Sequence, residues 1–208
     1  MDGMRTYPGA YVKYLAVFHG ARDFFECHEI MEEHWKTRRG TRHESCWLAL
    51  IRIAVACYHA RRGNWPGARK MMEKVIADMK PELLDELGLD GRRLAERMRE
   101  TMRRWMSGGE GGAAYEDPDL PIADPALLAA AVQCCRQLGW EWGTRSEHVR
   151  PDVVHRHLTR DRTAVIRARS DALIRKREER KLRAQSSEGH GANTDGTGAG
   201  QVKPDVKN

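Results

Sequence analysis

The sequence lacks the long apolar runs and sorting features that mark membrane and secreted proteins. No stretch of its 208 residues approaches the roughly 18 to 20 consecutive apolar residues that a membrane-spanning helix needs. The N-terminal segment has no long apolar region and no small-residue cleavage site, so we expect no secretory signal. The five cysteines are odd in number and lack CxxC spacing, which indicates buried apolar side chains in a reducing cytoplasm rather than a disulfide framework.

Signals for β-structure are also missing, because the sequence contains neither an alternating Val/Ile/Thr run nor an Asn-Gly pair. Hydrophobic residues make up 40% of the chain and charged residues 32%, which suits a soluble globular domain. We therefore predict an all-α fold, a compact helical bundle of about five helices with a C-terminal helical extension and a disordered tail. The predicted division is a bundle domain at 1–106, a linker at 107–124, a basic helical extension at 125–185 and the tail at 186–208.

Helical periodicity organises the first half of the chain. At about 100° per residue we predict one helix from near Tyr11 to about Lys36. The next helix, "CWLALIRIAVACYHARRG", is apolar nearly all round, which is typical of a central, buried helix. Before its charged end its strongly polar side chains are Arg52 and His59, which are seven residues apart and therefore share a face.

Turn signals divide the remaining helices. In "GNWPGA", Gly63 suits the left-handed residue that ends a helix, Asn64 suits an N-cap, and Pro66 suits the first turn of the next helix. Asp124 is predicted to cap a helix that has Pro125 at its first position. Further helices are predicted up to about residue 79, over 81–88, over 91–106, over 125–140 and from 151 onward.

The stretch "FHGARDFFECHEIMEEHWK", followed by "LIRIAVACYHARRGNWPGARKMMEKV", resembles the bacterial and archaeal family called domain of unknown function 309 (DUF309). The family pattern is an F-x-x-G-x-(Y/F)-F-E-x-H-E-x-x-E-x-x-W helix, an L-I-Q-x-A-x-A-x-x-H helix and a G-N-x-x-G-A turn. The matching residues are Phe18, Phe25, Glu26, His28, Glu29, Glu32, Trp35, His59, Gly63, Asn64, Gly67 and Ala68.

The resemblance covers roughly residues 18–106 and implies a small all-helical domain, typically cytoplasmic, with no established activity. The chain departs from the pattern in three places. Gly20 lies one position from the family's early glycine, Arg52 stands where glutamine is usual, and the residues after Ser107 lie outside the domain.

The polar residues of the motif lie among aromatic side chains, where burial of charge costs several kcal/mol unless partners are supplied. If the first two helices pack antiparallel, Glu29 and Glu32 face Arg52 and His59, with His28 at the edge. Bidentate pairing of arginine with carboxylates would then satisfy the buried oxygens. On this hypothesis the cluster is a structural network in a dry interior that fixes the register of the two helices.

Two functional interpretations remain beside the structural one. In the first, His28, Glu32 and His59 ligate zinc, iron or manganese as part of a metal-dependent enzyme. The spacing matches neither H-E-x-x-H nor the Glu-x-x-His of di-iron bundles, and Arg52 on the facing helix would oppose a cation.

The second functional interpretation is a pocket for a small anionic or polar ligand. Arg52 would anchor the ligand, His28 and His59 would donate hydrogen bonds, and the apolar walls would be Phe25, Trp35 and Trp47. No Ser, Thr or Cys lies in a recognisable activating motif. We therefore expect a non-enzymatic module for a protein or small-molecule partner, without a bound cofactor.

The positive charge of the chain is concentrated in its C-terminal part. From Arg145 to Arg183 there are thirteen Lys or Arg against six Asp or Glu, an excess of seven within a net charge of +6 for the whole chain. Salt-sensitive, non-specific nucleic-acid contact is one interpretation, and a solvated helix laced with salt bridges is the other. The contact residues would be Arg167, Arg169, Arg175, Lys176 and Arg177. In "LGWEWG", Trp140 and Trp142 are predicted to dock this extension onto the domain.

Overall fold

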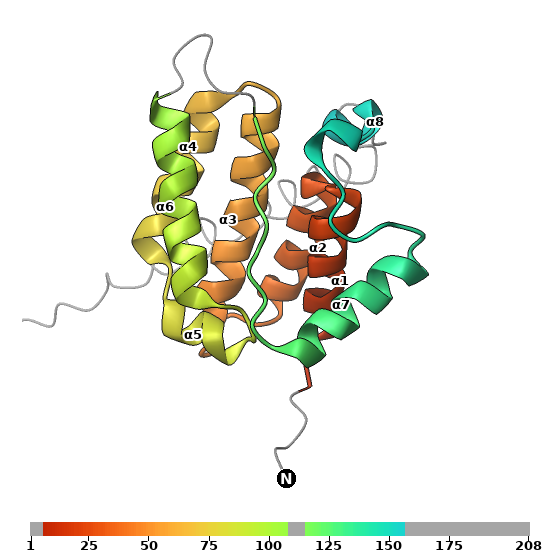
Figure 1. The fold of residues 1–208 in the computed structure, drawn as a ribbon. Coiled ribbons are helices and arrows are strands. Elements are labelled where there is room, and N and C mark those ends of the chain that lie inside the picture. The colour runs from red at the N-terminus through yellow and green to blue at the C-terminus, as the bar shows by residue number, and fades with distance from the viewer. Residues whose placement is uncertain (1–5, 108–114, 157–208) are drawn as a thin grey trace, which may run out of the picture. The chain divides into compact units, whose positions relative to one another are not determined.

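The computed structural model describes residues 6–107 and 115–156, and these residues form an all-helical bundle (Figure 1). The elements are α1 (Gly9–Ala16), the π-helix η1 (Val17–Ala21), α2 (Phe24–Lys36), α3 (Glu44–Arg61), α4 (Trp65–Asp78), α5 (Pro81–Glu86), α6 (Gly91–Ser107), α7 (Pro125–Gln137), the 3-10 helix η2 (Ser146–His148) and α8 (Pro151–Val154). Extended backbone in the described part contributes one isolated bridge, between Leu89 and Ile122. The predicted all-α class is confirmed.

The chain separates into two compact units, Met1–Thr159 and Arg160–Asn208, and every described residue belongs to the first. Within this unit α3 is the central helix, with α2 packed on one side and α4 on another. Leu50, Ile53, Ala54 and Cys57 of α3 are fully buried, which confirms the prediction from its apolar faces. No helix of the described residues combines the length and apolarity that a membrane span requires.

The single helix predicted over residues 11–36 is wrong, because two helices occupy this range. The amide of Arg22 donates to the carbonyl of Val17 at 2.9 Å, which closes a π turn, and Arg22 itself adopts a left-handed conformation with φ 54°. Asp23 then caps α2 by accepting from the amide of Glu26 at 3.0 Å. An aspartate followed three residues later by a glutamate is a signal for a helix start, which the apolar periodicity across Arg22 concealed.

The predicted punctuation between α3 and α4 is confirmed. Gly63 has φ 73°, and the side chain of Asn64 accepts from the amide of Gly67 at 3.1 Å, with Pro66 in the first turn of α4. Gly88, with φ 79°, likewise follows α5 close to its predicted end. Glycine is favoured at both places because a Cβ atom destabilises the left-handed region.

Residues 115–124 run as an extended segment beside the bundle, between α6 and α7 in the chain (Figure 1). This segment is tied to α3 by an ion pair between Arg61 and Asp117, whose nitrogen and oxygen atoms lie 2.7 Å apart. The side chains of Arg61 and Asp117 are 7% and 1% exposed, so the pair is buried. Arg61 also donates to the carbonyl of Arg22 at 2.7 Å, and the hydroxyl of Ser146 accepts from the amide of Asp117 at 2.7 Å. We call these contacts the Arg61–Asp117 network.

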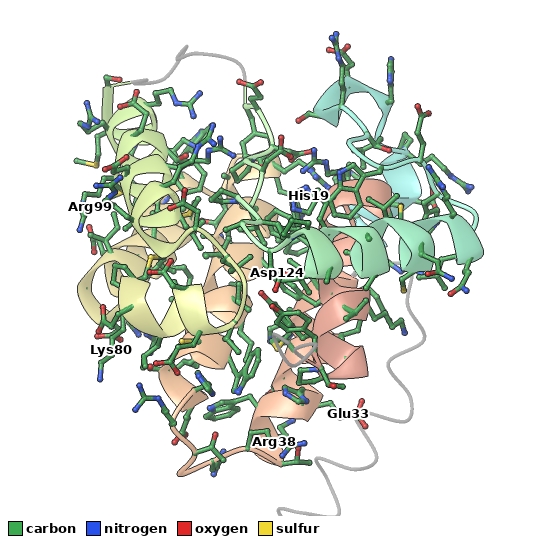
Figure 2. The ribbon with its side chains drawn as sticks, turned by 60° about the horizontal axis from the view of Figure 1, so that its bottom comes forward. His19, Glu33, Arg38, Lys80, Arg99 and Asp124 are labelled. Carbon is green, nitrogen blue, oxygen red and sulfur yellow. The ribbon has the colours of Figure 1, made fainter. Side chains whose placement is uncertain are left out.

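The helix α7 packs against α1. Its predicted cap is confirmed, since Asp124 accepts from the amide of Ala126 at 2.7 Å and from the hydroxyl of Tyr7 at 2.6 Å (Figure 2). Trp142 stacks on His19 at the end of α1 and η1, in agreement with the predicted docking role of the tryptophan pair. A Cβ atom at Gly20 would lie 2.4 Å from Sγ of Cys135, which explains a glycine where α7 approaches η1.

The described part of the long helix predicted from Pro151 is α8, which ends at Val154. The rest of that helix and the tail predicted at 186–208 lie outside the described residues. The division into a domain at 1–106, a linker and an extension stays a prediction.

Candidate functional site

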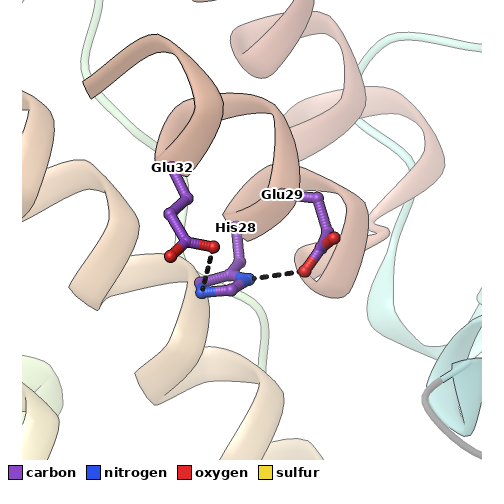
Figure 3. A group of neighbouring side chains, drawn as sticks. All are labelled: His28, Glu29 and Glu32. Atoms are coloured by element: carbon purple, nitrogen blue, oxygen red, sulfur yellow. Dashed lines mark hydrogen bonds and ion pairs between the residues drawn. The ribbon is translucent and has the colours of Figure 1, made fainter. Parts of the chain in front are cut away.

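Three polar side chains of the sequence motif gather on the surface of α2. Nδ1 of His28 lies 3.2 Å from Oε1 of Glu29, and its Nε2 lies 3.8 Å from Oε2 of Glu32. Figure 3 shows the imidazole between the two carboxylates. Glu32 also lies 3.2 Å from the ammonium group of Lys36, one helical turn further on. We refer to His28, Glu29 and Glu32 as the α2 cluster.

The dry interior predicted for these side chains is wrong. The side chains of His28, Glu29 and Glu32 are 30%, 32% and 36% exposed, so water reaches each of them. The fully buried residues of α2 are Phe24, Cys27 and Met31. The helix therefore turns its apolar residues inward and leaves the α2 cluster at the boundary between protein and solvent.

The predicted pairing of Glu29 and Glu32 with Arg52 and His59 is also wrong. The guanidinium of Arg52 pairs with Asp78 at the end of α4. Nδ1 of His59 lies 3.0 Å from the side-chain nitrogen Nδ2 of Asn64, the residue that caps α4. Arg52 and His59 have their partners on α4 and its cap, although α3 packs against both α2 and α4.

The electrostatic state of His59 follows from this position. Partial burial, with a smaller effect from the guanidinium of Arg62, lowers the pKa of His59. A neutral imidazole accepts a hydrogen bond from the Asn64 amide through Nδ1, so the contact needs no charge on His59. His59 therefore acts within the α3–α4 turn.

The three predicted pocket walls do not form one wall. Phe25 packs close to His28 and to Tyr58, with ring centroids 6.5 and 5.8 Å apart. Trp47 contacts Tyr11 and His34, with ring centroids 5.4 and 4.9 Å apart, and belongs to the core. The guanidinium carbon of Arg39 lies over the ring of Trp35, 4.4 Å from the ring centroid.

The α2 cluster is a potential metal-ligand set. One ligand atom from each of His28, Glu29 and Glu32 can be chosen so that all three lie within 4.8 Å of one another. Imidazole nitrogen combined with carboxylate oxygen suits zinc, iron or manganese. The sequence prediction named His28 and Glu32 but chose His59 as the third ligand, where the structure brings Glu29. Adjacent residues such as His28 and Glu29 lie about 100° apart around the helix. The glutamate side chain is long enough to bring its carboxylate next to the imidazole all the same, and helical periodicity takes no account of side-chain length.

The residues predicted to contact nucleic acid, Arg167, Arg169, Arg175, Lys176 and Arg177, lie outside the described residues. The structure therefore leaves that interpretation as a prediction.

Comparison with known proteins places the same segment in a family. Residues 11–71, which contain α2, α3 and the turn into α4, match the family described as "Domain of unknown function (DUF309)". The chain is similar to the uncharacterized protein YpuF of Bacillus subtilis, with 39% identity over 176 residues that cover 84% of this chain and 99% of YpuF. An uncharacterized protein of Aquifex aeolicus is 32% identical over 57 residues, which cover 27% of this chain and 17% of that protein. No solved structure is significantly similar to the chain. The resemblance found in the motif is thus confirmed, and the chain belongs to the DUF309 family.

Proposed function

We propose that this domain is a small-ligand-binding module whose ligand is a divalent transition-metal ion held by the α2 cluster. The observation that carries the proposal is the convergence of one imidazole and two carboxylates within 4.8 Å on a single helix face. Ligand atoms bound to zinc lie about 2.0 to 2.2 Å from the ion, which puts neighbouring ligand atoms about 3 Å or slightly more from each other. The two contacts of His28, at 3.2 and 3.8 Å, are close to that spacing.

A metal ion can use only one nitrogen of His28, and the two carboxylates face different nitrogens (Figure 3). If the ion binds through Nε2, Glu32 can act as a ligand from the position it now has. Glu29 would have to rotate toward the same side of the imidazole ring. Such a rotation would exchange the present contacts of Glu29, including the one with Nδ1 of His28, for a bond to the ion. The partial exposure also leaves coordination positions for water or for a further ligand.

The charge of the site favours a cation. Two carboxylates beside one imidazole supply two negative charges, and a divalent ion would neutralise both. Lys36 offsets part of this charge through Glu32, but its side chain is 56% exposed and can move into solvent. The sequence raised Arg52 as an obstacle to a cation, and its pairing with Asp78 removes that guanidinium from the acids of α2.

The test is isothermal titration calorimetry of the full chain with Zn²⁺ and Mn²⁺, together with elemental analysis after purification without added metal. We expect one ion per chain, and we expect His28→Ala and Glu32→Gln to abolish stoichiometric binding. Glu33→Gln is the matched control, because Glu33 is an exposed neighbour on α2 (labelled in Figure 2) that lies outside the cluster. Helical content by circular dichroism verifies that each variant folds.

His59→Ala separates the two ligand sets. If Glu29 is the third ligand, the variant retains the ion; if His59 is the third ligand, as the sequence alone predicted, the variant loses it. Failure of wild-type protein to bind either ion, or unchanged binding by His28→Ala, would refute the proposed function.

A further inference from the structure

A cavity of about 240 Å³ that is open to solvent lies away from the α2 cluster, among η1, α6, the segment 115–124 and the loop after α7. Its polar lining consists of His19, Arg93, Arg97 and Asp119, and Trp142 contributes an aromatic wall. The volume exceeds the roughly 30 Å³ that one water molecule occupies in the liquid. The cavity therefore has room for a small polar molecule.

His19, labelled in Figure 2, is the buried group of this lining and is 4% exposed. Its ring stacks on Trp142 with centroids 4.5 Å apart, and its carbonyl accepts from the amides of Gly143 and Thr144. Nε2 of His19 is buried and has no hydrogen-bond partner among the described residues. A buried polar atom without a partner costs about 1 to 3 kcal/mol, and a donor that reached Nε2 from the cavity that His19 lines would offset this cost.

The backbone of this region is unusual as well. His19 belongs to the π turn that ends at Arg22, whose left-handed conformation is rare for a residue with a side chain. Single π turns inside helices occur frequently at functional sites. Here the turn ends the first helix directly beside the cavity.

The neighbouring carboxylate determines which nitrogen of His19 carries the proton. Nδ1 lies 3.5 Å from Oδ1 of Asp119, and contacts with His19 and Arg22 hold the pKa of Asp119 well below its usual range. Burial lowers the pKa of His19, so its ring is neutral near pH 7. An ionised carboxylate only accepts hydrogen bonds, so we assign the proton to Nδ1. Nε2 then presents a lone pair that needs a donor.

The charge around the cavity is positive. The guanidinium of Arg22 pairs with Asp119 at 2.7 Å and neutralises it. Arg97 donates to the carbonyl of Asp119 at 2.7 Å, and Arg93 is exposed at the rim with no ion pair to any described residue. Arg22, Arg93 and Arg97 are positive and Asp119 is negative, which leaves two positive charges at and beside the cavity. Water alone would satisfy Nε2 but would not balance these charges.

We propose that this cavity binds inorganic hydrogen phosphate between Arg93, Arg97 and His19. Arginine pairs with phosphate oxygens through charge-assisted hydrogen bonds. The P–OH group donates to Nε2 of His19, which supplies the donor that this nitrogen lacks. Hydrogen phosphate carries two negative charges, equal to the excess of the cavity. The site and its ligand are independent of the metal proposed for the α2 cluster.

Sulfate provides the sharpest comparison because it has the size and charge of hydrogen phosphate but carries no proton near pH 7. Its oxygen would face the lone pair of Nε2 without a hydrogen bond. An unmade buried hydrogen bond of about 1 to 3 kcal/mol corresponds to a factor of about 5 to 150 in affinity. We therefore expect phosphate to bind at least about fivefold more tightly than sulfate.

The experiment is calorimetric titration of the full chain at pH 7.5 with inorganic phosphate, glycerol 3-phosphate and sulfate. We expect one phosphate per chain, a loss of about tenfold or more in Arg93→Gln, and a change below about twofold in Arg92→Gln. Arg92 is the matched control, since it is an exposed neighbour on α6 that does not line the cavity and undergoes the same change of charge. In His19→Gln the amide can donate, so the preference for phosphate over sulfate should disappear.

Glycerol 3-phosphate is mainly a dianion without a P–OH group at pH 7.5, so we expect it to bind, like sulfate, more weakly than inorganic phosphate. Absence of inorganic phosphate binding at about 10 mM, binding of sulfate or glycerol 3-phosphate equal to or tighter than that of phosphate, or equal losses in Arg92→Gln and Arg93→Gln would overturn the proposal. Arg93 is exposed, so its variant remains informative even if His19→Gln does not fold. Retained phosphate binding in His28→Ala would show that this site does not depend on the α2 cluster.

Discussion

The α2 cluster and the Arg61–Asp117 network are built from similar charged residues but lie in different surroundings. In the α2 cluster about one third of each side chain is exposed, whereas Arg61 and Asp117 are almost entirely buried. The network joins α3 to a segment more than fifty residues later in the chain, since Arg61 and Asp117 are separated by 56 positions. All three members of the α2 cluster belong to one helix.

This difference separates charge that holds the fold from charge that is available to a ligand. A buried ion pair persists only when each partner neutralises the other and further hydrogen bonds satisfy the remaining atoms. Arg61 meets this condition through Asp117 and through the carbonyl of Arg22, whereas Oδ2 of Asp117 is buried without a hydrogen-bond partner among the described residues. The α2 cluster faces no such requirement because solvent reaches it, and the proposed metal ion would compete with water, His28 and Lys36 for its carboxylates.

The largest test of this comparison is Asp117→Ala. Removal of the carboxylate leaves the guanidinium of Arg61 buried without its counter-charge, which costs about 3 to 5 kcal/mol. We expect a loss of that size in the free energy of unfolding, measured by urea denaturation followed by circular dichroism.

Asp152→Ala is the control, because Asp152 pairs with Arg150 at 2.9 Å on the surface, with both side chains more than half exposed. Exposed pairs contribute about 0 to 1 kcal/mol, so this variant should stay close to the wild type. Equal losses in Asp117→Ala and Asp152→Ala would contradict the distinction between a structural network and a surface cluster.

The helices themselves were largely predictable, because their signals are local. The caps Asn64 and Asp124, the proline after each, and the apolar residues around α3 fixed the ends and the burial of these helices. The break at Arg22 was missed, although the Asp23 cap was present in the sequence. The left-handed Arg22 is held by its guanidinium, which donates to the carbonyls of Thr144 and Pro118, and no local pattern records such distant contacts.

The charge partners were less predictable than the helices. The predicted pairing of Glu29 and Glu32 with Arg52 and His59 is wrong, and the buried pair that the structure contains, Arg61–Asp117, was not predicted. Periodicity placed Arg52 and His59 on one face of α3, yet it could not decide whether that face meets α2 or α4. Asp117 lies in a segment that the composition predicts as a linker, so its burial follows only from the tertiary fold.

A smaller effect, which depends on pH, should arise at His19 beside the network. Burial has the largest effect and lowers the pKa of His19. The carboxylate of Asp119 raises this pKa, and the guanidinium groups of Arg22 and Arg97 lower it further. The unfolded chain binds a proton near pH 6.5 that the folded chain does not, so this contribution to stability is complete above pH 6.5 and is lost as the pH falls below it. We expect His19→Asn to show a shallower loss of stability between pH 7.5 and 5.5 than the wild type, measured by urea denaturation at each pH.

His148→Asn is the control for that measurement, because His148 is 71% exposed. It should lose stability with pH as the wild type does. The slope will not vanish in His19→Asn, since the pKa values of His34 and His59 are also lowered by burial and act with the same sign. Identical slopes in His19→Asn and His148→Asn would show that His19 titrates as an exposed group, and the contrast in burial would fail at this residue.

The smallest expected effect is that of Glu32→Gln in metal-free protein, and it tests the exposed side of the comparison. The substitution removes a carboxylate 3.2 Å from Lys36 and 3.8 Å from His28 while preserving the shape of the side chain. Because such partly exposed pairs contribute little, we expect the free energy of unfolding to fall by less than about 1 kcal/mol. Addition of Zn²⁺ should then stabilise the wild type but not the variant, with a gain of about 2.7 kcal/mol at a hundred times the dissociation constant. A loss as large as that of Asp117→Ala without metal would mean that the α2 cluster holds the fold together, and its carboxylates would then not be free to bind an ion.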